Sequence, residues 1–139
     1  GHGGNIPTIQ AAIAESYSNW SLAGETCPYR IQSRNWWDLP GVMKVCRDIF
    51  PVGDGSHATA SEVAVTYYGY PDSVKKVEMT PKIAPDGDFA DADDYRKTFP
   101  DGRIGSDPSQ ATPEKGKTIT LAARDSLITE ATAFFRAND

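Results

Sequence analysis

The stretch TPEKGKTITLAARDSLITEATAFFR, residues 112–136, predicts one long helix. Thr112 suits the N-cap, Pro113 the first helical position and Glu114 the first turn. Gly116 lies inside this helix, where glycine costs up to about 1 kcal/mol, so we expect another backbone to approach closely there. Apolar residues then recur at helical spacing, which predicts one buried face: Ile119, Ala122, Ala123, Leu127, Ala131 and Phe134.

Earlier parts of the chain predict shorter elements. Helical spacing of apolar residues or helix-start signals indicate helices over residues 7–18, 41–50 and 59–68. Residues 29–35 alternate apolar and polar side chains, which favours a strand. Residues 80–108 are rich in Pro, Gly and Asp and lack calcium-loop spacing, so we expect a long acidic surface excursion. Such loops are uncommon unless they cover a site or a neighbouring subunit.

Composition limits the class of protein. The 139 residues include 39% hydrophobic and 24% charged side chains, which suits one globular domain over residues 1–139. A net charge of −5 without a basic run argues against nucleic acid as a partner. No apolar run is long enough for a membrane span. Cys27 and Cys46 lack metal-type spacing, so we expect reduced thiols and a cytoplasmic location rather than a secreted one.

Two histidines lie in similar surroundings. His2 lies in GHGGN, residues 1–5, where Asn5 suits an N-cap before a predicted helix. His57 lies in GDGSHA, residues 53–58, and Glu62 follows five residues later. Histidine and carboxylate side chains together suit zinc or manganese, so the pattern predicts part of a metal site.

Three of these features also have simpler interpretations. The glycine-rich start could be a frayed end or a cloning remnant. Glu62 could be a helix-start carboxylate that the helix dipole favours. The pair Trp36–Trp37 could fill the core or an interface, or one of the two could wall a pocket and stack on a flat polar substrate.

Three motifs resemble the creatininase family of creatinine amidohydrolases. GHGGN at residues 1–5 resembles the family's Asn-Gly-His-Gly-Gly-Asn motif, and HATASE at residues 57–62 matches His-Ala-x-x-x-Glu. GSDPSQATPEKG at residues 105–116 matches Gly-x-Asp-Pro-x-x-Ala-Thr-x-Glu-Lys-Gly. The motifs follow in the family's order, and an earlier half with Glu-x-x-His and a following Asp is not matched here.

The resemblance implies a fold and a set of roles. It implies an α/β fold of three layers, with a mostly parallel sheet flanked by helices, of which this chain forms the C-terminal half. His2 and Glu62 would bind a divalent metal, zinc or manganese with iron also possible, at a site of two ions. His57 would move the proton, Asn5 would orient a neighbour or donate to the oxyanion, and Trp36 would line the active site.

The implied function is metal-dependent hydrolysis of non-peptide C–N bonds, as in a cyclic amide or a formamide. Creatininase itself carries Glu where Gly4 stands, so the resemblance favours a relative such as a formamide deformylase or a peptide-trimming hydrolase. The alternative is a non-catalytic or decayed member that acts as a subunit or interaction domain.

The resemblance also implies partners. An N-terminal half would bind as a separate or cleaved chain, because the family's motif places a labile Asn-Gly bond before Gly1; a separately encoded subunit or a shortened chain would also explain the sequence. A small-molecule amide substrate and a homo-oligomer, hexameric in the family, are expected as well.

Overall fold

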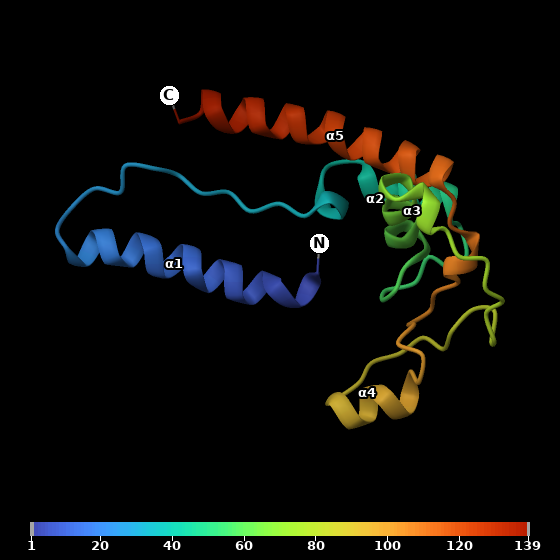
Figure 1. The fold of residues 1–139 in the computed structure, drawn as a ribbon. Helices are drawn as coiled ribbons and strands as arrows, with labels where there is room; N and C mark the ends of the chain where they lie inside the picture. Colours follow the sequence, from blue (N-terminus) through green and yellow to red (C-terminus); the bar gives the residue numbers. More distant parts are fainter. Residues whose placement is uncertain (1, 139) are drawn as a thin grey trace.

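The computed structural model describes residues 2–138 and is built from helices joined by long connections (Figure 1). The four helices that the sequence predicted are confirmed, within a few residues at their ends, and a fifth was not predicted. The α-helices are α1 Ile6–Leu22, α2 Val42–Ile49, α3 Ala60–Gly69, α4 Ala92–Thr98 and α5 Pro113–Arg136. Single 3-10 turns are η1 Gly3–Asn5, η2 Trp36–Asp38, η3 Pro71–Ser73 and η4 Pro108–Gln110.

The core lies where α2, α3 and the first half of α5 meet. Its buried members come from these helices and from the segments that lead into them: Leu39, Val42, Cys46, Phe50, Ala60, Ala64, Ala111, Ile119 and Ala123. Thr112 caps α5 by accepting a hydrogen bond from the Lys115 backbone N–H, as the sequence predicted. Hydrophobic burial therefore holds a small three-helix unit together.

At Gly116 the backbone of α5 lies directly against that of α3. Gly116 is buried, and a Cβ atom placed on it would overlap the carbonyl oxygen of Ala64 in α3. The predicted close backbone contact is therefore confirmed. Only a residue without a side chain lets the two helices pack at this separation.

The expected α/β architecture is wrong for this chain. Within residues 2–138 there is no β-strand and no sheet, and the pairing that occurs is a single antiparallel bridge between His57 and Ile104. Residues 29–35, predicted as a strand, are irregular coil. The reason is physical: a strand needs a neighbour to pair its backbone groups, and the sequence offers one strand-like stretch among helices and Pro/Gly-rich connections.

Helix α1 lies apart from the core, with the connection that follows running back between it and α5 (Figure 1). None of its residues is buried. Tyr17 accepts a hydrogen bond from the Ile31 backbone N–H (2.7 Å), and the connection reaches α5 through an ion pair between Arg34 and Glu130 (3.1 Å). Hydrogen bonds and the edge-on contact of Trp20 with Tyr29, rather than a shared core, thus hold α1 against the connection.

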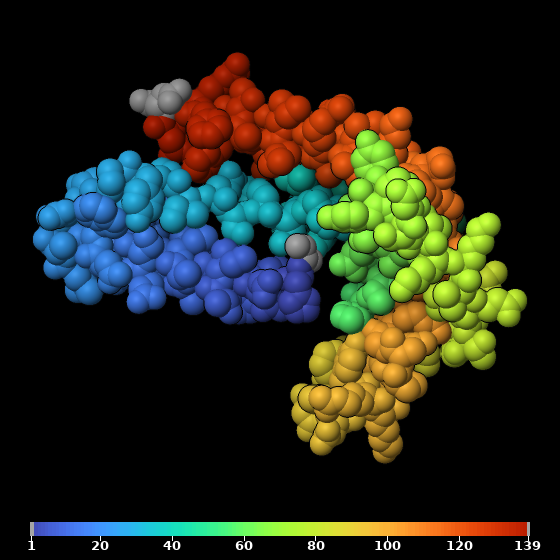
Figure 2. All heavy atoms as spheres, in the orientation of Figure 1, coloured from blue at the N-terminus to red at the C-terminus, as the bar shows by residue number. Residues whose placement is uncertain are grey.

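Residues 80–108 are not a simple loop. They contain α4, which Asp91 caps through the backbone N–H groups of Asp93 and Asp94. This part projects from the core in the space-filling view (Figure 2). Its base is fixed by Arg103, a buried residue whose side chain donates to the carbonyls of Pro81, Lys82 and Ser106 and to the Asp101 carboxylate. The acidic excursion over residues 80–108 is therefore fixed to the rest of the chain at its base.

Both cysteines are free thiols, as the sequence predicted. Cys46 is completely buried in the core, and burial, with a smaller contribution from the Asp54 charge, raises the pKa of its thiol to about 11. Among residues 2–138, none of the helices combines the length and apolar character that crossing a bilayer requires.

Replacement of Gly116 tests the helix crossing. We expect Gly116→Ala to lower the free energy of unfolding by about 1–3 kcal/mol, because the added methyl group forces α3 and α5 apart. Urea denaturation would measure this loss as a lower midpoint with an unchanged slope. Gly69→Ala is the matched control, since the space around Gly69 is open; equal losses in both variants would contradict the crossing.

Candidate functional site

One pocket of about 460 Å³ gathers most of the residues that the sequence singled out. It lies between the N-terminal turn, η2 and the loop that leads into α3. His2, Trp36, His57 and Glu62 all line it. The remaining lining residues are Gly3, Gly4, Trp37, Met43, Asp54, Gly55, Ser56, Thr59 and Ser61.

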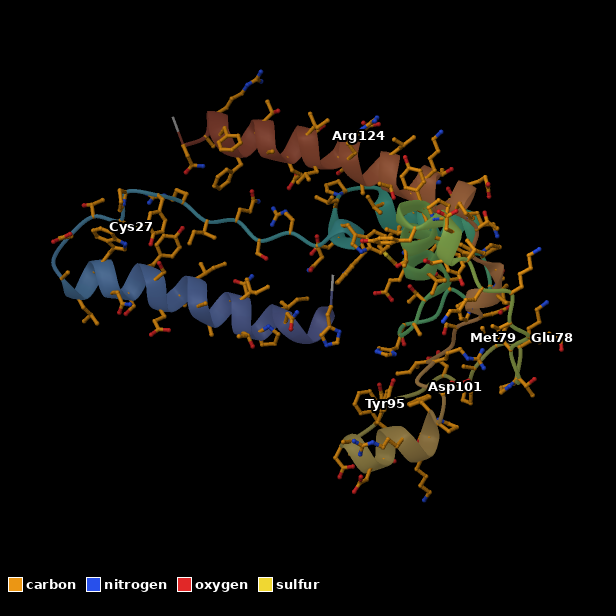
Figure 3. The ribbon with its side chains drawn as sticks, in the orientation of Figure 1. Cys27, Glu78, Met79, Tyr95, Asp101 and Arg124 are labelled. Carbon is orange, nitrogen blue, oxygen red and sulfur yellow. The ribbon has the colours of Figure 1, made fainter. Side chains whose placement is uncertain are left out.

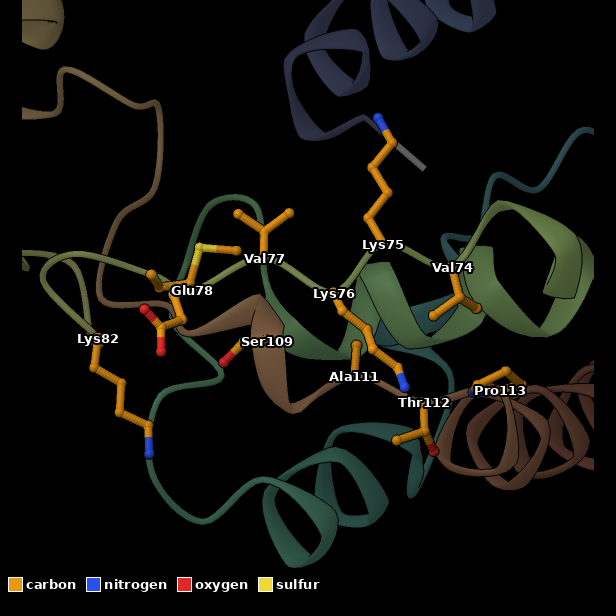
Figure 4. Close-up of a pocket in the computed structure, with 11 residues that line it drawn as sticks. Val74, Lys75, Lys76, Val77, Glu78, Lys82, Ser109, Ala111, Thr112 and Pro113 are labelled. Carbon is orange, nitrogen blue, oxygen red and sulfur yellow. The ribbon is translucent and has the colours of Figure 1, made fainter.

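A larger cavity of about 870 Å³ lies elsewhere, between residues 74–82 and the start of α5 (Figure 4). Its charged lining consists of Lys75, Lys76, Lys82 and Glu78. It contains neither histidine, and its three lysines would repel a metal cation. The smaller pocket is therefore the candidate site, because it holds imidazole and carboxylate groups together.

The loop that carries His57 is clamped against residues 102–106. The Ser56 backbone N–H donates to the Ile104 carbonyl (2.9 Å), and the His57 carbonyl accepts from the Ile104 N–H (3.2 Å) and the Ser106 hydroxyl (2.9 Å). Gly55 has φ +79°, and a Cβ atom there would overlap the Ile104 carbonyl oxygen. Glycine at this position therefore allows the clamp to close.

The His57 ring is held from one side. Its Nδ1 lies 2.6 Å from the Gly102 carbonyl oxygen and 3.2 Å from the Tyr95 hydroxyl, which itself donates to the same carbonyl (2.8 Å). A carbonyl can only accept, so the short bond requires the proton on Nδ1. The Nε2 lone pair is then left to bind a proton or a metal ion.

Glu62 has a structural role at the start of α3. Its Oε2 accepts hydrogen bonds from the Thr59 hydroxyl (3.0 Å) and backbone N–H (3.3 Å), and Thr59 accepts from the Glu62 N–H (3.0 Å). This is a capping box. The helix-start interpretation of Glu62 is confirmed, and it is compatible with a second role, because neither side-chain bond uses Oε1.

The N-terminal residues divide between pocket and helix. The exposed His2 ring lies over Gly4, where a Cβ atom would come 2.6 Å from Nε2, so the missing side chain makes room for the imidazole. Asn5 is the N-cap residue of α1 but makes no side-chain capping bond, and it does not line the pocket. Trp36 packs against the core and also lines the pocket.

Asp54 is a pocket residue that the sequence interpretation missed. Its half-buried carboxylate accepts from the Ser61 backbone N–H (2.8 Å) and hydroxyl (3.2 Å). Burial raises its pKa, the Ser61 bonds partly offset this, and the Glu62 charge raises it further. Its place three residues before His57 was the available signal. Tyr95 and Gly102 gave none, being 38 and 45 residues away in sequence.

The donor chemistry of this pocket suits a divalent cation, but the ligand set is incomplete. His2 supplies an imidazole and Glu62 a carboxylate, as zinc and manganese sites use. In the part of the chain from 2 to 138, however, no three His, Cys, Asp or Glu side chains are grouped so as to hold an ion. The described residues of this chain therefore do not form a complete metal site by themselves.

The pocket thus brings imidazole and carboxylate groups from two loop-to-helix junctions to one place. A family model described as creatinine amidohydrolase matches residues 1–130. The chain therefore belongs to the creatininase family, whose membership indicates amidohydrolase-type activity. A search of curated proteins returned no significant match.

The raised pKa of Asp54 gives a pH-dependent prediction. A carboxyl group whose pKa is higher in the folded than in the unfolded protein stabilises the fold at pH values below its unfolded pKa. That contribution to the free energy of unfolding is lost as the pH rises through the folded-state pKa. Asn keeps an acceptor for the Ser61 N–H without this charge. Relative to wild type, Asp54→Asn should therefore gain stability between acidic and neutral pH, measured by urea denaturation at each pH.

Asp101→Asn provides a control of opposite sign. Slight burial raises the pKa of Asp101, but hydrogen bonds from Arg103 outweigh it and lower that pKa. This variant should therefore lose stability, relative to wild type, over the same rise in pH. Parallel profiles for wild type and Asp54→Asn would contradict the role assigned to burial.

Proposed function

We propose that this chain supplies part of the active site of a metal-dependent amidohydrolase acting on non-peptide C–N bonds, such as a cyclic amide or a formamide. Membership of the creatininase family supports the reaction class. The observation that carries the proposal is the meeting of His2, His57 and Glu62 in one pocket from distant parts of the chain.

His2 and Glu62 are the proposed metal ligands. The ring of His2 is exposed at the pocket, and Oε1 of Glu62 takes no part in the capping box. Asp54 adds a second half-buried carboxylate, so the pocket favours a cation. Zinc or manganese suits these donors, with iron also possible and two ions per site expected. When bound, the metal would activate the attacking water and polarise the substrate carbonyl.

His57 is the proposed proton carrier. The Gly102 carbonyl holds the proton on Nδ1, so Nε2 can accept a proton from water and return it to the leaving nitrogen. Imidazole suits this exchange because its ordinary pKa lies near neutrality. The clamp between residues 53–57 and 102–106 keeps the ring at the pocket without using Nε2.

Trp36 and Asn5 have supporting roles in the proposal. Trp36 walls the pocket edge-on to Trp37, with ring centroids 5.7 Å apart, and would stack on a flat amide. Asn5 ends the turn η1 that follows His2 and is the N-cap residue of α1, and its side chain would orient its neighbour or donate to the oxyanion. Creatininase itself carries Glu where Gly4 stands, which favours a relative that acts on a substrate other than creatinine.

A second polypeptide would provide the remaining ligands. The donors His2 and Glu62 leave a tetrahedral or octahedral ion under-coordinated, and the described residues group no third His, Cys, Asp or Glu with them. We propose that the partner is the N-terminal half of the enzyme, and that the complete unit assembles into a homo-oligomer.

Substitutions in the pocket test this proposal. The assays use the full chain with the polypeptides that co-purify with it, zinc and manganese titrations, and turnover of cyclic amides, formamides and short peptides. His2→Ala and Glu62→Gln should weaken metal binding at least about tenfold. His57→Ala should keep the metal and lower turnover about 100- to 10,000-fold, because it removes the proton carrier.

Two features make the result decisive. Gln preserves a capping box, so Glu62→Gln removes a metal ligand without removing the α3 cap. Glu114→Gln is the matched control, since Glu114 is an exposed helix-start carboxylate outside the pocket. Unchanged metal binding and turnover in all three pocket variants would favour the non-catalytic interaction domain instead.

A further inference from the structure

The acidic excursion reaches back to the candidate site. Tyr95, on α4, lies on the side of that helix that faces the rest of the chain (Figure 3). Its ring meets His57 edge-on, with centroids 5.9 Å apart, and its hydroxyl lies 3.2 Å from His57 Nδ1. Tyr95 does not line the pocket. Its contact with the site is therefore made through His57.

The Gly102 carbonyl links the two side chains. It accepts hydrogen bonds from Tyr95 (2.8 Å) and from His57 Nδ1 (2.6 Å). Gly102 has φ +79°, and its N–H donates to the Phe99 carbonyl at the end of α4 (2.9 Å). The peptide group after Gly102 lies in a tight turn, and the Tyr95 hydroxyl fixes the direction of its carbonyl.

Tyr95 is itself firmly placed. Its ring packs against Phe89 (centroids 4.8 Å apart) and Phe99 (5.6 Å), and Phe99 is buried. The Asp91 cap fixes the start of α4. A hydroxyl held on such a support costs little further entropy when it forms hydrogen bonds, so it can hold the Gly102 carbonyl in one orientation.

We infer that Tyr95 is a positioning residue that, through the Gly102 carbonyl, keeps the His57 proton on Nδ1 and its Nε2 turned to the pocket. This inference rests on the proposed function in one respect, the role of His57 in turnover. In this inference, α4 supports the side of the His57 ring that faces away from substrate.

Tyr95→Phe tests the inference, because it removes the hydroxyl and keeps the aromatic packing. Nitrogen NMR of the His57 ring in the full chain should show Nδ1–H in wild type. In the variant, the freed carbonyl turns to water, so the ring should relax toward the mixed tautomers of an exposed imidazole. In the turnover assay, kcat should fall about 10- to 100-fold with KM little changed.

Tyr67→Phe is the matched control. The Tyr67 hydroxyl also makes two backbone bonds, to the N–H and the carbonyl of Lys75, and it lies outside the pocket. This variant should leave the His57 tautomer and kcat unchanged. An equal tautomer change in both variants would show a general loss of order and overturn the inference.

The two proposals fail in different ways. If Tyr95→Phe leaves the tautomer and kcat unchanged while His57→Ala abolishes turnover, the positioning role is wrong and the proposed function stands. If Tyr95→Phe shifts the tautomer while neither it nor His57→Ala lowers turnover, Tyr95 positions the ring as inferred and the proposed catalytic role of His57 is wrong.

Discussion

The contact between Gly116 and the Ala64 carbonyl determines how the rest of the core is arranged. It brings α5 against α3 at the distance of two backbones, so small residues fill the interface and Ile119 is fully buried beside it. With α3 fixed, its N-terminus is fixed too, and that end carries Thr59, Ser61 and Glu62. The candidate site is thus built on a helix that packs closely against α5.

A second constraint places His57 relative to that helix. The Ile104 backbone and the Ser106 hydroxyl hold the loop before α3. Arg103 holds the base of the excursion. These groups come from the segment that leads into α5, more than forty residues beyond His57. His57 is exposed, yet hydrogen bonds to residues 102–106 fix both its backbone and its ring. A site on a loop gains in this way the precision that helices usually provide.

The sequence predicts what depends on local chemistry. Helices α1, α2, α3 and α5 were predictable from caps and apolar spacing, and Gly116 from its cost inside a helix. The strand over residues 29–35 was not, because alternation describes one face of a strand and cannot supply the partner that makes a sheet. The pocket residues His2, His57 and Glu62 were predicted from motifs, and Trp36 from the tryptophan pair and the family resemblance. Contacts such as Tyr95–His57 depend on how distant segments fold back, which no local pattern contains.

Under the proposed function, one physical cause explains two features: the metal ligands are too few, and α1 buries none of its residues. A helix of 17 residues that buries no side chain gains little from tertiary packing and is marginal on its own. Its exposed apolar residues include Ile6 and Ile9, in the first turns after His2. If a partner chain covers this face, it fixes α1, and with it the imidazole at the start of the chain. Metal binding and partner binding would then be thermodynamically linked, because the ion requires His2 in place and the partner's own ligands nearby.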